Sequence, residues 1–166
     1  GSGLGTQMLP VADGSDMMGS LRNPGAFNNV IGYRPSTNVM SGRDASQRPL
    51  STSGPMGRNT ADTIQLLKTI AVKDVGDDFS PMNLSGKKIA WLGDLNNYLA
   101  LESGIIPLCE ASLSQVSDAG ASVDSVMPQF NFDDLWFCWT TLRHSGRASM
   151  KRFYDDPATR DMLKPD

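Results

Sequence analysis

The chain has 166 residues, of which 39% are hydrophobic and 20% charged, and its formal net charge is −3. This length predicts a single globular domain, and the mild acidity argues against nucleic acid as a partner, because a phosphate backbone attracts clustered positive charge. No apolar run reaches the length of a membrane span and no leader is recognised, so we expect no membrane partner and a cytoplasmic location.

Residues 1–60 contain ten of the sixteen glycines and no lysine, which predicts a turn-rich region with short strands. The apolar runs Met8–Ala12 and Val30–Tyr33 are the candidate strands. Ser20 follows the first run after a turn of Gly, Asp and Ser residues, where a helix is expected to begin. A serine there can be a helix N-cap, or it can lie beside free backbone N–H groups that stabilise an anion. The polar segment 37–53 reads as a long functional or mobile loop.

Residues 61–166 show regular periodic patterns. Helices are predicted from Asn59 or Thr60 to about Val72, over 104–119, from Asn131 onward, and after Asp156. Strands are predicted over 88–92 and 121–126. The order strand, helix, strand over 86–126 predicts a right-handed parallel βαβ unit, and we expect the strands at 8–12 and 30–33 to join the same sheet. Trp136 and Trp139 share one helix stripe, which favours a core or a subunit interface.

The segment from Asp13 to Pro24 reads DGSDMMGSLRNP. It resembles the nucleophile segment of the amidase-signature hydrolases, G-[ST]-D-x-G-G-S-[IL]-R-x-P. Residues 26–36 (AFNNVIGYRPS) and 53–62 (SGPMGRNTAD) are similar to two further motifs of that family. The resemblance implies an α/β fold, a fragment of the family's mixed sheet flanked by helices. It also implies one truncated domain over 1–166, with a glycine-rich nucleophile-loop region at 1–60 and a regular α/β region at 61–166.

The same resemblance implies roles for individual residues. Ser20 would be the catalytic nucleophile that carries an acyl group, a chemistry in which serine needs an adjacent base. The backbone N–H groups of Met17, Met18 and Gly19 would form the oxyanion hole, and Asp16 and Arg22 would be scaffold of the loop. The family has glycine where this chain has Met18, so Met18 is expected to take an ordinary backbone conformation.

The family's base is a lysine with a second serine in a cis peptide, both upstream of the nucleophile. Only 19 residues precede Ser20, and the first lysine in the chain is Lys68. The single histidine, His144, lies between arginines and is interpreted as a surface residue. We therefore expect weak hydrolysis of small-molecule amides or esters through Ser20, with a catalytically silent binding or assembly module as the alternative.

Neither a cofactor nor a metal ion is expected. Cys109 and Cys138 are 29 residues apart with no ligand spacing around them, and they are interpreted as buried free thiols that suit a reducing cytoplasm. Both ends of the chain look truncated beside the family pattern. Bare sheet edges and apolar faces favour association, so we expect a homo-oligomer or a complementing chain.

Overall fold

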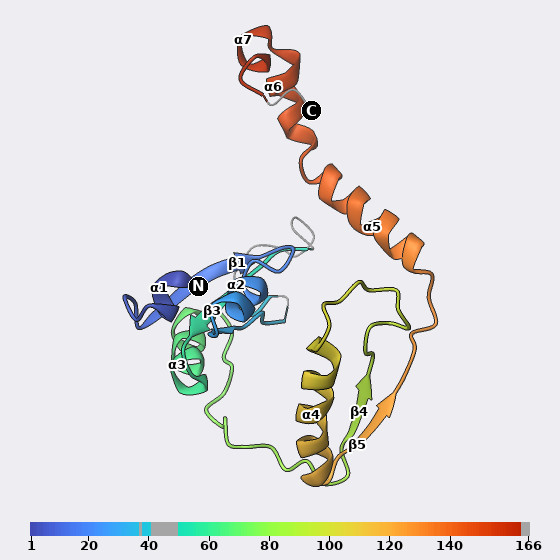
Figure 1. Ribbon diagram of the computed structural model, residues 1–166. Helices are drawn as coiled ribbons and strands as arrows, with labels where there is room; N and C mark the ends of the chain where they lie inside the picture. The colour runs from blue at the N-terminus through green and yellow to red at the C-terminus, as the bar shows by residue number, and fades with distance from the viewer. Residues whose placement is uncertain (37, 41–49, 164–166) are drawn as a thin grey trace. The chain divides into compact units, whose positions relative to one another are not determined.

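The computed structural model describes residues 1–36, 38–40 and 50–163 (Figure 1). Helices and short strands give the mixed α/β fold that the sequence predicts. The chain groups into two compact units, one of Gly1–Asp77 with Trp136–Asp166 and the other of Asp78–Leu135. Most of the predicted loop at 37–53, namely residue 37 and residues 41–49, lies outside the described residues.

The first unit contains a three-stranded antiparallel sheet in the order β1-β3-β2. Its elements, in chain order, are α1 (Ser2–Gly5), β1 (Val11–Asp16), α2 (Arg22–Phe27), β2 (Ile31–Gly32), β3 (Thr52–Gly57) and α3 (Thr60–Ile70). β1 begins at Val11, later than the predicted strand at 8–12, and it includes Asp13 and Gly14, two of the residues expected to form a turn. These residues are extended because every residue of β1 pairs with β3, from Val11 opposite Gly57 to Asp16 opposite Thr52. The Asn59 side chain accepts a hydrogen bond from the Asp62 N–H at 2.8 Å, which confirms the predicted cap of α3.

The core of the first unit is a small cluster of Leu4, Leu21 and Met56, with Ala12 and Val30 packed against it. Two glycines let backbone approach this cluster closely. A Cβ at Gly32 would collide with the backbone oxygen of Leu21, and one at Gly54 would collide with the backbone oxygen of Tyr33. Leu21, which follows the predicted nucleophile, is completely buried. The packing therefore anchors the C-terminal end of the loop that carries Ser20.

The second unit is a βαβ arrangement of β4 (Lys88–Trp91), α4 (Ile105–Asp118) and β5 (Ser122–Ser125). β4 and β5 are parallel and in register from Lys88–Ser122 to Trp91–Ser125, as predicted. The prediction that β1 and β2 share this sheet is wrong, because β4 and β5 form a separate two-stranded sheet. The physical reason is that β3 offers two edges and pairs with β1 on one and β2 on the other.

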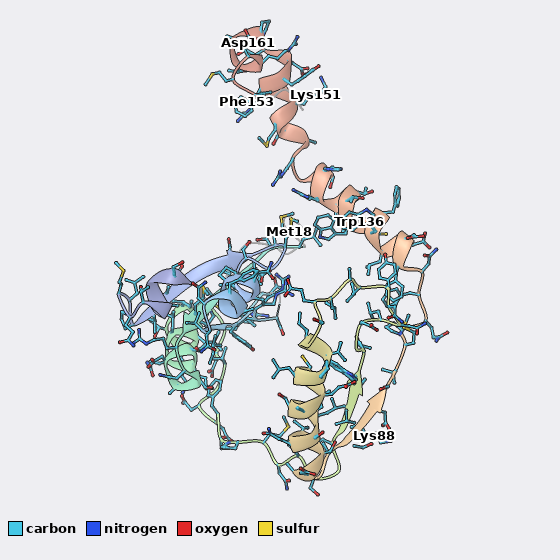
Figure 2. All side chains as sticks on the ribbon, in the orientation of Figure 1. Met18, Lys88, Trp136, Lys151, Phe153 and Asp161 are labelled. Carbon is cyan, nitrogen blue, oxygen red and sulfur yellow. The ribbon has the colours of Figure 1, made fainter. Side chains whose placement is uncertain are left out.

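The C-terminal part consists of α5 (Phe132–Ser145), a 3₁₀ turn η2 (Ala148–Met150), α6 (Lys151–Asp155) and α7 (Pro157–Arg160). Asp156 caps α7, whose first residue is the proline, as the sequence predicts. The predicted stripe on α5 is not part of a core within the described residues: the Trp136 and Trp139 rings stack 5.0 Å apart, and Trp136 is 62% exposed (Figure 2).

Two further sequence predictions concern buried thiols and membrane spans. Both cysteines are free, but the expectation that they are buried is wrong, since Cys109 is half-buried and Cys138 is exposed on α5. None of the helices in the described parts of the chain is both long and apolar enough to cross a bilayer.

Candidate functional site

Ser20 lies in the loop Met17–Leu21, which connects β1 to α2. The serine is exposed, while Leu21 beside it is fully buried and holds the end of the loop in the core. Within residues 1–36, 38–40 and 50–163, Ser20 Oγ takes part in no hydrogen bond, so its hydroxyl is open to an incoming group. Ser20 is thus an exposed serine on a loop whose C-terminal end is fixed by the burial of Leu21.

The carboxylate of Asp16 closes this loop from the β1 side. Its Oδ1 accepts the Gly19 N–H at 2.8 Å and its Oδ2 accepts the Leu21 N–H at 3.3 Å. The guanidinium of Arg22 binds the same carboxylate through Nε at 2.9 Å and Nη2 at 3.0 Å, a two-pronged geometry that carboxylate and guanidinium both favour. Asp16 is itself fully buried. One carboxylate therefore joins the residues on both sides of Ser20.

A second arginine, Arg34, reaches Asp16 from the segment that follows β2. Its Nη1 donates to the backbone oxygen of Asp16 and, at 3.3 Å, to Oδ1 of the carboxylate. Its Nη2 donates to the backbone oxygen of Leu50 at 3.3 Å. Sequence reasoning missed this residue. The signal that could have found it is the motif at 26–36, in which Arg34 fills the position where the family has lysine or arginine.

The electrostatics of this cluster favour the ionised carboxyl. The hydrogen bond from Arg22, assisted by the N–H groups of Gly19 and Leu21, holds the pKa of Asp16 far below its usual range, although burial acts in the opposite direction. The same contact raises the pKa of Arg22. Asp16 is therefore a permanent anion at neutral pH and cannot serve as a general base there.

Within the loop Met17–Leu21, Gly19 is the residue whose backbone conformation requires a glycine. Its φ is +102°, in the left-handed region, and an added Cβ would lie 2.7 Å from Oδ1 of Asn23. Met18 has no such requirement: it is absent from the described residues with positive φ, which agrees with the conformation predicted for it, and its side chain is about half exposed (Figure 2). A methionine at position 18 is thus compatible with this loop.

The predicted oxyanion donors differ in availability. The Gly19 N–H is occupied by Asp16, whereas the N–H groups of Met17 and Met18 donate to no other residue of the described chain. α2 contains only six residues, so its dipole is small and local N–H groups carry most of any anion stabilisation here.

No base is joined to Ser20 in the described parts of the chain. His144 lies in the last turn of α5, and its backbone oxygen accepts the N–H of Arg147. No hydrogen bond within those parts links Ser20 to His144 or to Asp16. The structure therefore brings Asp16, Arg22 and the loop together, and it does not bring a histidine to the serine.

The second unit contains a shallow hollow of about 430 Å³ at the carboxyl ends of β4 and β5. Trp91, Ile106, Glu110 and Met127 are among the residues that line it. None of the predicted site residues contributes to this lining, so the hollow is not part of the Ser20 site.

Comparison with known proteins identifies the family. A family model described as Amidase matches residues 1–154, which include the whole Ser20 loop with its Asp16 and Arg22 contacts. The chain belongs to the amidase-signature family. Members similar to this chain include amidases and amidotransferases.

Three relatives show the extent of the likeness. A glutamyl-tRNA(Gln) amidotransferase subunit from Corynebacterium jeikeium is 29% identical over 147 residues, covering 77% of this chain and 29% of that protein. The peptide amidase of Stenotrophomonas maltophilia is 27% identical with a TM-score of 0.58, covering 75% of this chain and 29% of the other. A bacterial aryl acylamidase shares the fold, with 22% identity, a TM-score of 0.78, and coverage of 98% and 38%. The chain spans about three tenths of the length of the curated relatives it matches.

Proposed function

We propose that this amidase-family chain hydrolyses amide or ester bonds of small molecules through an acyl-enzyme on Ser20. The observation that carries the proposal is an exposed serine whose loop is held from both sides by the buried carboxylate of Asp16. Such a loop keeps the serine in one place, which is what an attacking nucleophile needs. Asp16, Arg22 and Arg34 position the loop and do not touch the reacting atoms.

In the proposed reaction, Ser20 Oγ forms a bond to the substrate carbonyl carbon while its proton passes to a base. The N–H groups of Met17 and Met18 stabilise the oxyanion of the tetrahedral intermediate. Gly19 supplies the turn, because its own N–H is held by Asp16. The carbon–nitrogen or carbon–oxygen bond then breaks, the leaving group takes the proton, and water hydrolyses the acyl ester to release the acid and restore Ser20.

The base is the incomplete part of this site. Because no base contacts Ser20 within the described residues, we propose that a complementing chain or further polypeptide supplies it. Without that base, the 166-residue chain alone is expected to form the acyl-enzyme on Ser20 slowly, with water as the proton acceptor and the N–H groups of the loop as oxyanion donors. Activated esters are the substrates on which such weak activity is measurable. Two free cysteines support a reducing compartment, and we propose the cytoplasm.

The test is labelling of the purified chain with a fluorophosphonate, followed by peptide mapping and p-nitrophenyl acetate hydrolysis. We expect one label, on Ser20, and loss of both label and hydrolysis in Ser20→Ala. Ser15→Ala is the matched control, since Ser15 lies five residues away in β1, and it should label like the parent. Absence of any label on Ser20 would instead support the catalytically silent module.

A further inference from the structure

The 14-residue helix α5 has an apolar face that the described residues leave uncovered. Four residues on neighbouring turns lie on this face: Leu135, Trp136, Trp139 and Leu142. None of them is buried, and Leu135, Trp136 and Leu142 are 54%, 62% and 45% exposed. Phe132, at the start of the helix, does not belong to the uncovered face, because its ring stacks on that of Tyr98, 4.5 Å between ring centres. We call the four residues the α5 stripe. A repeat of this spacing is the pattern by which two helices pack along each other.

Charge is distributed unequally along the same helix. Asp133 and Asp134 lie in its first turn, and Arg143 and His144 lie in its last turn. The guanidinium of Arg143 sits over the Trp139 ring, 5.3 Å from the ring centre. Its Nε is buried and has no hydrogen-bond partner within the described residues, and a buried donor without an acceptor is costly. Arg143 is thus a cation at the end of the α5 stripe whose Nε lacks an acceptor in the described chain.

We propose that the α5 stripe binds the α5 stripe of a second copy of this chain, with the two helices antiparallel about a two-fold axis. This orientation places Leu135 opposite Leu142 of the second copy and brings the two Trp136–Trp139 pairs together at the centre. The acidic first turn of each helix then faces the basic last turn of the other, so that Asp133 of one copy is the acceptor for Arg143 of the other. A parallel pair would place like charges together, which would oppose association.

The interface is isologous, because the same residues serve on both copies and the contact closes on itself as a dimer. It does not depend on the proposed hydrolysis, since α5 contributes no residue to the Ser20 loop. It identifies which surface of the chain would carry the association expected from the sequence.

The first test is sedimentation equilibrium of the 166-residue chain at micromolar concentration, with twice the chain mass of 17.9 kDa expected. Trp136→Glu should weaken the dimer by at least about a hundred-fold, because each dimer loses two central indoles. Phe137→Glu is the matched control: Phe137 is 69% exposed and lies about 100° further round the helix, outside the stripe, so this variant should stay dimeric. A monomeric parent, or equal effects of the two variants, would overturn the proposal.

The second test reverses charges. Asp133→Arg and Arg143→Glu each place like charges in contact across the dimer, and each should be monomeric at concentrations where the parent is dimeric. An equimolar mixture of the two variants restores opposite charges in the contact, so a heterodimer should form. Circular dichroism of each variant checks that helix content is kept. Failure of the folded variants to associate on mixing would refute the antiparallel pairing.

Discussion

Replacing Asp16 with asparagine tests the physical basis of the Ser20 loop. Asparagine keeps the shape of the Asp16 side chain but removes its charge. The carboxylate accepts hydrogen bonds from the N–H groups of Gly19 and Leu21 and from the side chains of Arg22 and Arg34, and the amide nitrogen of asparagine would have to face one of these donors. Removing one partner of a buried ion pair costs about 3–5 kcal/mol. The Arg22 side chain is 56% exposed and can rehydrate, so the lower limit applies. We therefore expect Asp16→Asn to lose about 3 kcal/mol in free energy of unfolding.

Urea titration monitored by far-ultraviolet circular dichroism measures this loss, and a fall in melting temperature of about 6–12 °C should accompany it. Asp13→Asn is the matched control, because Asp13 lies exposed in the same strand and should change stability by less than about 0.5 kcal/mol. Fluorophosphonate labelling of Ser20 should slow in Asp16→Asn and not in Asp13→Asn. Equal stability of the two variants would refute the view that Asp16 holds the loop.

The pH dependence of the difference between parent and Asp16→Asn has a definite sign. The pKa of Asp16 is lowered in the folded chain, so its stabilisation is fully present above the unfolded pKa, near 3.9, and is lost as pH falls toward the folded pKa. The stability difference between parent and Asp16→Asn should therefore be constant from about pH 5 to 7 and shrink below about pH 4. A difference that stays unchanged down to about pH 2.5 would contradict the assignment of the effect to this charge.

Three further changes test the surroundings of the loop. Gly19→Ala should cost about 1–2 kcal/mol in unfolding free energy, because alanine resists the left-handed backbone and meets the Asn23 side chain, whereas Met18→Ala should cost less. Arg34→Lys should lose about 1 kcal/mol in the same urea assay, since one ammonium cannot reproduce the planar fork that joins Asp16 and Leu50, and an unchanged midpoint would contradict this. His144→Ala should leave ester hydrolysis within about two-fold of the parent, and an inactive variant would show that this histidine has become the base of Ser20.

Some features were predictable because their causes are local. The side chain of Asn59 reaches the Asp62 N–H three residues later, and Pro157 suits a first helical turn whatever surrounds it. The parallel pair of β4 and β5 follows from a strand, a helix and a strand in succession, because such connections repeat the same geometry. The motif around Ser20 likewise pointed to the amidase-signature family from a dozen adjacent residues.

The chain's sequence by itself determined these local elements, the family, and the position of the serine within its motif. Only the tertiary structure decided that β1 and β2 share β3 rather than the parallel sheet, and that Arg34 reaches Asp16 across 18 positions. It also decided that the described residues leave the α5 stripe uncovered. The physical reason is common to all three. A strand edge can pair with many strands, a charge with many opposite charges, and an apolar face with many apolar surfaces. Which partner each one contacts is set by residues far apart in the chain.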